Sequence, residues 1–179
     1  MSNPTNLNNS PKNQGHAAIG MGSNLGESLD TLKNAIQTLD EITGIKLITY
    51  SSWYRTKPIG PPQPDYINGC ALLKVELTPH KLLEVLLDVE QKFKRVRLEH
   101  WGPRTLDLDL ILYDDLILDT PNLQIPHPRM KERAFVLVPL AEIAPNWIDP
   151  VSGKAIALLL EKVECSGISK LYNSENQCP

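Results

Sequence analysis

The stretch HWGPRTLDLDLILY at residues 100–113 is the most informative part of this chain, because it combines a strand of leucines with two carboxylates. Leucine occupies every second position from Leu106 to Leu112, and Asp107 and Asp109 lie between. Side chains of a β-strand alternate between its two faces. We therefore expect all four leucines to face a hydrophobic core and both aspartates to face the opposite side.

Asp107 and Asp109 form a candidate metal site. Two residues along a strand separate the carboxylates by about 6–7 Å, and at an effective dielectric near 20 the two charges repel by about 2–3 kcal/mol. A small set of oxygen ligands suits Mg²⁺, which keeps several waters and is usually completed by substrate phosphates. The pattern predicts Mg²⁺ and a nucleotide; the alternative is two aspartates that face water on an edge strand.

Arg95, Arg97 and Arg104 precede the aspartate strand in a segment that also contains Gly and Pro. Guanidinium groups bind phosphate oxygens in pairs, and a binding loop is expected in such a segment. We therefore interpret the three arginines as phosphate ligands. Lys92 and Lys94 fit better as a solvated basic end of a helix.

Length and composition indicate one domain. The chain has 179 residues and 41% hydrophobic content, enough for one sizeable core. We expect a single domain over residues 16–172, a disordered tail rich in Asn, Ser and Pro at residues 1–15, and a flexible tail at residues 173–179. Cys70 is expected in the core, because the three cysteines lie far apart and lack metal-site spacing.

The net charge and the N-terminal segment argue against nucleic-acid binding and against a membrane anchor. A net charge of -3 argues against a general nucleic-acid binder, because the basic residues form a local cluster. The first 14 residues contain no apolar run, so we expect neither a signal peptide nor a membrane anchor and place the protein in the cytoplasm. Small anionic ligands remain the expected partners.

Hydrophobic periodicity and turn residues predict alternating strands and helices. The expected strands cover residues 16–21, 45–54, 69–77, 106–112 and 116–118. The expected helices begin behind Ser28 and behind Thr78–Pro79 as candidate caps, and cover residues 132–141 and 155–160. A long Pro-rich loop is expected at 55–68, and the Gly-rich turn at 22–26 is expected to be structural, because it lacks the spacing of a phosphate loop. This order is typical of an α+β sandwich.

Five segments, in order from about residue 17 to 150, closely resemble the 6-hydroxymethyl-7,8-dihydropterin pyrophosphokinase family of folate biosynthesis. They are GMGSNLG at 20–26, SSWYRTKPIG at 51–60, PDYIN at 64–68, WGPRTLDLD at 101–109, and PHP at 126–128 continuing through Phe135. The resemblance implies a ferredoxin-like α+β fold, with helices packed on a mostly antiparallel sheet, that acts as a monomer. It also implies transfer of pyrophosphate from ATP to the hydroxymethyl group of the reduced pterin, which leaves AMP.

The resemblance assigns roles residue by residue. Asp107 and Asp109 would hold two Mg²⁺ ions and are counted as catalytic together with Arg95 and Arg97, of which Arg95 lies where a mobile loop brings an arginine over the phosphates. The residues implied for the pterin are Tyr66 and Phe135 on its faces, Asn68 at its polar edge, and backbone groups around Thr56 and Ile59. The residues implied for ATP are Glu90, Arg97, Trp101, Arg104, Leu110, His127 and Arg133.

Some of these residues have simpler explanations when taken alone. Phe135 could be ordinary core packing, and His127 between two prolines could be a surface turn residue. Two other classes of protein share parts of the pattern: a nucleotide-binding regulatory domain without catalysis, and an RNA-binding module on a similar sheet. The first would not need Tyr66, Asn68 and Phe135 together, and the second would need exposed aromatics in place of the aspartates.

Overall fold

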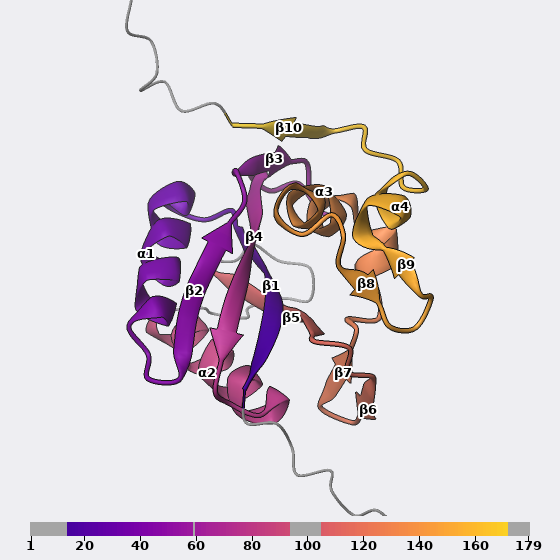
Figure 1. Ribbon diagram of the computed structural model, residues 1–179. Helices are drawn as coiled ribbons and strands as arrows, with labels where there is room; N and C mark the ends of the chain where they lie inside the picture. Colours follow the sequence, from indigo (N-terminus) through magenta and orange to yellow (C-terminus); the bar gives the residue numbers. More distant parts are fainter. Residues whose placement is uncertain (1–13, 59, 94–104, 172–179) are drawn as a thin grey trace, which may run out of the picture.

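The computed structural model describes residues 14–58, 60–93 and 105–171, and it contains a central antiparallel sheet (Figure 1). The strands of this sheet are β1 (Gly15–Ser23), β2 (Ile45–Tyr50), β3 (Tyr54–Thr56), β4 (Tyr66–Val75), β5 (Asp107–Tyr113) and β10 (Ile168–Lys170). Their order is β10-β3-β4-β1-β5, and β2 also pairs with β4. All of these pairs are antiparallel.

Helices and two small hairpins complete the described residues. The helices are α1 (Ser28–Asp40), α2 (Pro79–Lys92), α3 (Ala134–Ile143) and α4 (Ile156–Leu160), with a 3-10 turn η1 (Met130–Glu132) before α3. The hairpins are β6 (Leu118–Thr120) with β7 (Leu123–Ile125), and β8 (Ile148–Asp149) with β9 (Lys154–Ala155). None of the described helices is both long and apolar enough to cross a membrane.

The connectivity is that of a ferredoxin-like fold. The chain runs β1-α1-β2-β4-α2-β5, and in space the four strands lie in the order β2-β4-β1-β5. Each half is a strand, a helix and a strand, and the two halves interleave so that β1 and β4 are central. The expected α+β class with a mostly antiparallel sheet is confirmed.

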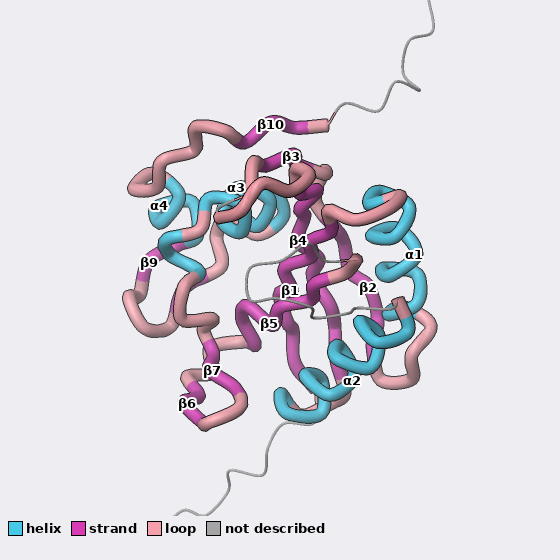
Figure 2. The backbone as a smooth tube through the Cα atoms, turned by 180° about the vertical axis from the view of Figure 1, so that it is seen from behind, coloured by secondary structure: helices cyan, strands magenta, loops and turns pink. Residues whose placement is uncertain are grey.

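The two faces of the sheet carry two separate cores. Helices α1 and α2 cover one face, and α3 and α4 cover part of the other, as Figures 1 and 2 show from opposite sides. Ile19, Leu73 and Leu86 belong to the first core. Cys70 and Leu137 belong to the second, so the expected burial of Cys70 is confirmed.

Strand β5 departs from simple alternation at one point. Its register with β1 shifts because Ala18 pairs with Leu112 and Ile19 pairs with Leu110, which leaves Ile111 between them without a partner on β1. This is a β-bulge, and it turns Ile111 and Leu112 both to the α3 face. The first three leucines pack under α1 and α2 as expected, but the expectation that Leu112 shares their face is wrong.

The region between residues 45 and 68 also differs from expectation. The single strand expected at 45–54 is two strands, because the chain leaves the β2 ladder after Tyr50 and Ser51 bonds to Cys70 through both its backbone and its side chain. Strand β3 then pairs with the start of β4 at Tyr66. The expected loop at 55–68 is therefore shorter, and its ends are strands that lie beside each other.

Three smaller expectations have clear outcomes. Ser28 is not a cap: it is the first residue of α1, and Glu27 before it makes no side-chain cap bond. The short strand near residue 116 begins at Leu118 and pairs with β7, away from the main sheet. Thr78 is confirmed as the N-cap of α2, because its hydroxyl accepts a hydrogen bond from the backbone N–H of Lys81 at 3.3 Å.

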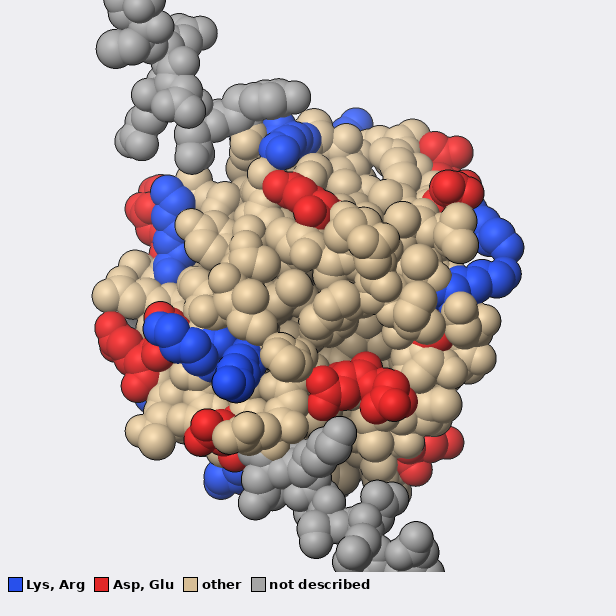
Figure 3. All heavy atoms as spheres, in the orientation of Figure 1, with Lys and Arg blue, Asp and Glu red and all other residues tan. Residues whose placement is uncertain are grey.

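Charged side chains are scattered over the face shown in Figure 3. Acidic and basic residues form small separate groups there, and an uncharged area extends across the middle. Nucleic-acid binding needs basic residues gathered on one face or stripe. The described residues present no broad basic area on this face.

The cap of α2 gives a test of the fold. We expect Thr78→Ala to lower the free energy of unfolding by about 1 kcal/mol, because an N–H at the start of α2 loses its acceptor. Urea unfolding followed by circular dichroism measures the change. Thr78→Ser keeps the hydroxyl and serves as the control; equal losses in both variants would contradict the capping role.

Candidate active site

A trough crosses three neighbouring strands on the α3 face of the sheet. In the middle strand β1, Gly22 pairs with Asn68 on one side and with Asp107 on the other, and Gly20 pairs with Asp109. The two glycines leave the backbone of β1 bare between the amide and the carboxylates. A Cβ atom on Gly22 would lie 3.0 Å from Oδ1 of Asn68, so a larger residue there would fill the trough.

Helix α3 closes one side of this trough. Phe135 and Val136 line a cavity together with Asn68, Asp107 and Asp109. The cavity has a volume of about 20 Å³, which is close to the space that one water molecule needs. The structure thus brings together Asn68, both aspartates and Phe135, which the family resemblance placed in one site.

The polar edge of the trough is organised by Asn68. Its Nδ2 atom donates a hydrogen bond of 2.7 Å to Oγ1 of Thr56 on β3, and both residues are buried. This bond uses one amide donor and leaves the amide oxygen toward Gly22. Thr56 contributes its side chain here, whereas the resemblance implied backbone groups.

Tyr66 is held from the turn that follows β1. The Nδ2 atom of Asn24 donates to Oε1 of Gln63 and to the carbonyl oxygen of Pro64, both at 3.0 Å. The hydroxyl of Tyr66 donates to the same Gln63 oxygen at 3.4 Å. Asn24 in the expected turn at 22–26 thus has a structural role, whereas Gly22 belongs to β1 and lines the trough cavity. The sequence did not predict that Asn24 and Gln63 support Tyr66, because polar residues in loops follow no periodic pattern.

Arg133 lies between the carboxylate of Asp109 and the aromatic ring of Phe135. Its Nη1 atom is 3.9 Å from Oδ2 of Asp109, and its guanidinium carbon is 5.5 Å from the centre of the Phe135 ring. The first distance is that of an ion pair without a close hydrogen bond, and the second permits a cation–π contact. Arg133 was expected to contact ATP, and here it also borders the aromatic residue expected to contact the pterin.

Glu90 supports the aspartate strand from the other side. The side chain comes from α2 and is only 2% exposed, and its Oε1 atom accepts a hydrogen bond of 2.7 Å from the backbone N–H of Leu108. Strand β5 is at the edge of the described sheet, so this N–H has no neighbouring strand to bond to. Glu90 thus fixes the backbone between Asp107 and Asp109; direct contact with ATP stays a prediction.

A larger cavity adjoins the other side of β5. Its volume is about 590 Å³, and Asp109, Leu110 and His127 are among its lining residues. Asn122 and Gln124 from the β6–β7 hairpin also line it. The volume is in the range of small-molecule sites. Neither hairpin residue was expected, because a short polar turn in the sequence does not indicate what its side chains face.

His127 is held in its neutral form. Its Nδ1 atom lies 3.2 Å from the backbone N–H of Arg129, which donates to it. Burial lowers the pKa of His127 to about 4, assisted by the positive charges of Arg133 and Arg129 and opposed by Asp107. With Nδ1 accepting, the ring proton is on Nε2 at neutral pH.

The two aspartates fit a magnesium ion that substrate phosphates complete. Both side chains are partly exposed on the trough face, and the bare backbone of Gly20 and Gly22 gives a ligand access to them. Within residues 14–58, 60–93 and 105–171, no group of three or more His, Cys, Asp or Glu side chains is placed to bind a metal. Two carboxylates and several waters or phosphates are the usual ligands of Mg²⁺.

Several expected site residues lie outside the described residues. They are Ile59, Arg95, Arg97, Trp101 and Arg104. Their assignments stay predictions.

The pKa of His127 can be tested directly. We expect the ring resonances of His127 in an NMR titration to shift with a midpoint near 4, and His127→Gln identifies them. Since the folded pKa is below that of a free histidine, the protein should lose stability as the pH falls from about 6.5 toward 4. Arg133→Gln should raise the midpoint, and a midpoint near 6.5 in the unaltered chain would contradict this account.

Comparisons with known proteins agree with the geometry. The model of the family 7,8-dihydro-6-hydroxymethylpterin-pyrophosphokinase (HPPK) matches residues 18–145. The 2-amino-4-hydroxy-6-hydroxymethyldihydropteridine pyrophosphokinase of Synechocystis sp. is 58% identical over 85% of this chain and 78% of its own. The enzyme of the same name from Methylorubrum extorquens is 40% identical over 87% of this chain and 98% of its own.

The fold also matches solved structures. The wild-type HPPK-DHPS of Plasmodium falciparum with pteroate aligns with a TM-score of 0.67 and 15% identity. The alignment covers 83% of this chain and 42% of that protein, so this chain spans less than half of it. At this identity the likeness concerns the fold alone, but the match of the family model and the close relatives show that the chain belongs to the HPPK family.

Proposed function

We propose that this chain carries out the reaction of its family in folate biosynthesis: it transfers the pyrophosphate group of ATP to the hydroxymethyl group of 6-hydroxymethyl-7,8-dihydropterin and releases AMP. One observation carries the assignment to this site. Asp109 lines both the trough cavity beneath Phe135 and the larger cavity beside the β6–β7 hairpin. A carboxylate at the junction of two cavities is where the donor phosphates and the acceptor hydroxyl have to meet.

The larger cavity is the proposed ATP site. Its volume of about 590 Å³ accommodates a nucleotide, and His127 and Asp109 both line it. The phosphates then point to Asp109 and Arg133, and the base lies toward the β6–β7 hairpin. A neutral His127 donates a hydrogen bond from Nε2 without adding charge, whereas Arg133 neutralises phosphate oxygens.

The trough is the proposed pterin site. Asn68 offers an oriented amide to the polar edge of the heterocycle, and Phe135 and Tyr66 supply the aromatic faces. A bicyclic ring is far larger than a cavity of about 20 Å³, so pterin binding requires the ring of Phe135 or Tyr66 to turn aside. Stacking of a flat ring contributes about 1 kcal/mol per contact beyond the burial of area.

Asp107 and Asp109 are the proposed ligands of two Mg²⁺ ions. When bound, Mg²⁺ would offset the phosphate charge and favour loss of the hydroxyl proton. The contribution of the chain is mainly to position and to neutralise. Glu90 keeps the aspartate strand in place through Leu108, and Arg133 accepts negative charge that develops on the transferred group.

We also expect the chain to act as a monomer in the cytoplasm, with small molecules as its only partners. The scattered charge in Figure 3 supports the absence of a nucleic-acid surface on that face. Sedimentation equilibrium of the purified chain at micromolar concentration tests the monomer. A mass that rises with concentration would contradict it.

The reaction is tested by AMP release. The purified chain with ATP and Mg²⁺ should release AMP only when 6-hydroxymethyl-7,8-dihydropterin is added. We expect Asp109→Asn to lower turnover by about 100-fold or more, because one carboxylate of the charge-stabilising set is lost, while pterin binding measured by calorimetry persists.

Asp115→Asn is the matched control for this variant. Asp115 is an exposed aspartate in the turn that follows β5, at the end of the strand distant from the trough. Its loss removes the same charge and should leave turnover unchanged. Near-normal turnover in Asp109→Asn would remove the metal assignment, and AMP release without pterin would contradict the proposed reaction.

The pterin face of the site is tested by Phe135→Leu. Leucine keeps an apolar side chain over the sheet but cannot stack, so we expect the KM for pterin to rise about tenfold, the equivalent of about 1.4 kcal/mol. The KM for ATP should change by less than about twofold. Steady-state kinetics with each substrate varied in turn measures both, and equal changes in the two constants would speak against stacking.

A further inference from the structure

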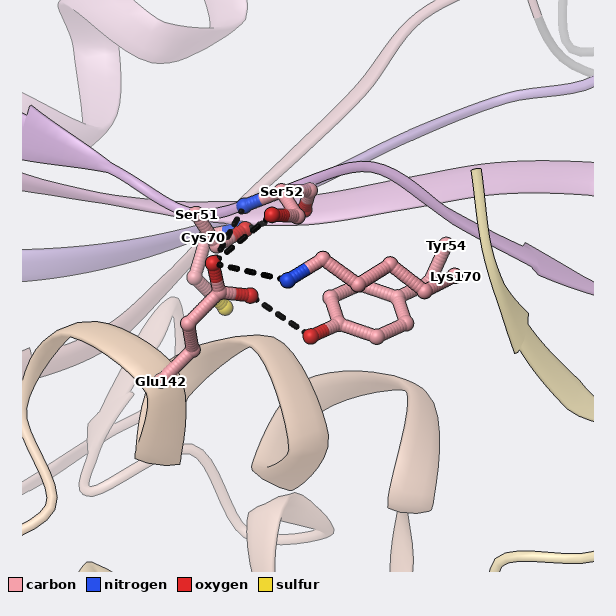
Figure 4. Close-up of polar contacts among 6 residues, drawn as sticks. All are labelled: Ser51, Ser52, Tyr54, Cys70, Glu142 and Lys170. Carbon is pink, nitrogen blue, oxygen red and sulfur yellow. Dashed lines mark hydrogen bonds and ion pairs between the residues drawn. The ribbon is translucent and has the colours of Figure 1, made fainter. Parts of the chain in front are cut away.

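A polar cluster outside the trough joins α3 to the sheet (Figure 4). At its centre, the carboxylate of Glu142 accepts hydrogen bonds from the hydroxyl and the backbone N–H of Ser52 at 2.7 and 3.1 Å. Its other oxygen accepts one from the hydroxyl of Tyr54 on β3 at 2.6 Å. Lys170 of β10 is 3.6 Å away. One side chain of α3 thus holds the β2–β3 connection, β3 and β10.

The hydrogen bonds to Ser52 and Tyr54 are the strong part of this cluster. Burial alone would raise the pKa of Glu142, but the bonds from Tyr54 and Ser52, with the charge of Lys170, lower it below its usual value. The carboxylate is therefore ionised at neutral pH, and its hydrogen bonds are charge-assisted. The pair with Lys170 joins two partly exposed side chains, 41% and 30% accessible, and contributes little.

The cluster is connected to the pterin side of the trough through two elements. On α3, Phe135 precedes Glu142 by seven residues, so both lie on the same face of the helix. On β3, Tyr54 and Thr56 are two residues apart and share one face of the strand. Thr56 in turn holds the amide of Asn68. Glu142 therefore sets how the helix that carries Phe135 sits against the strand that orients Asn68.

Helix α3 lacks one of its internal hydrogen bonds because of its own sequence. Pro139 lies inside the helix and has no N–H to donate to the carbonyl group of Phe135. The first turn is consequently bonded less completely within the helix than an ordinary turn. A second link acts there: the thiol of Cys70 donates to the carbonyl oxygen of Val136 at 3.5 Å, while the backbone N–H of Cys70 donates to Ser51.

We propose that Glu142 is a positioning residue for pterin binding: it clamps α3 to β3 so that Phe135 and Asn68 face each other across the trough. This inference rests on the proposed function of the trough. Glu142 itself does not contact the reacting groups. Its effect should fall mainly on the pterin, because the residues that line the larger cavity come from β5, α2, the β6–β7 hairpin and the His127–Pro128 turn, and none of them lies on α3 or β3.

Glu142→Gln tests the proposal with little change of shape. The amide of glutamine cannot accept from Ser52 and Tyr54 with both of its polar atoms, since one of them is a donor. We expect the KM and the Kd for pterin to rise by about 5- to 20-fold. The KM for ATP should stay within about twofold of that of the unaltered chain. Tyr54→Phe removes one bond of the cluster and should give a smaller rise of the same kind.

Two control variants separate positioning from general stability. Tyr113→Phe removes a hydrogen bond of 2.7 Å from the Tyr113 hydroxyl to the carbonyl oxygen of Leu77, beyond the bulge of β5, and should lower the melting temperature without a selective change for pterin. Lys170→Met removes only the exposed charge pair and should have little effect on either constant.

The outcomes are distinct. If Glu142→Gln and Tyr54→Phe leave the pterin constants within twofold, or change both substrates equally as a loss of stability would, the positioning role is wrong. If Glu142→Gln does not fold, Tyr54→Phe alone decides between these results. If the unaltered chain releases no AMP with pterin, the proposed function fails first, and the pterin Kd by calorimetry still tests the clamp.

Discussion

The bare backbone of β1 at Gly20 and Gly22 is the constraint on which the site depends. These residues occupy a central strand, between Asn68 on β4 and the aspartates on β5. Any side chain there would separate the two groups that a bound substrate has to reach together. Glycine in a strand interior costs about 0.5–1 kcal/mol in conformational entropy relative to alanine. The ladders with β4 and β5 on either side offset that cost.

The negative charges of Asp107 and Asp109 are offset in part by a nearby arginine and not by His127. The two carboxylates on one strand repel, and Arg133 lies 3.9 Å from one of them. His127 adds no positive charge, because burial and the neighbouring arginines keep it neutral. Arg133 therefore supplies positive charge beside Asp109, and it also borders the ring of Phe135. Incoming phosphates meet both a positive group and a place for metal ions.

The sequence predicts those parts of the site in which residue types alternate with the period of a strand. The alternation of Leu and Asp places both carboxylates on the face opposite the main core, as the structure has it. The bulge at Ile111 could not be predicted, because residues 110–113 are all hydrophobic and give no sign of a change of face. Glu90 was missed as a support for β5, since nothing in the sequence tells that a buried edge N–H needs an acceptor.

Other roles required the family resemblance. Tyr66 and Phe135 look like core aromatics in the sequence, and only the shared motifs assign them to a pterin. The Glu142 cluster joins α3 to Ser52 and Tyr54, which lie 90 and 88 positions earlier in the chain, a separation at which periodicity carries no information. The assignments of the arginines before β5 rest on the resemblance and on the composition of their segment.

The bulge at Ile111 divides β5 into two segments. Before the bulge the even-numbered residues pack in the first core, and at Leu112 the even-numbered side chain packs in the second core. Up to Leu110, odd positions face the trough and even positions the first core; from Leu112 onward the assignment is reversed. A repacking of Leu112 against α3 therefore places no demand on the alternation that orients Asp107 and Asp109. The part of β5 after the bulge can accordingly change in sequence while the part that carries Asp107 and Asp109 keeps its alternation. The sequence of this strand can therefore vary without loss of the site.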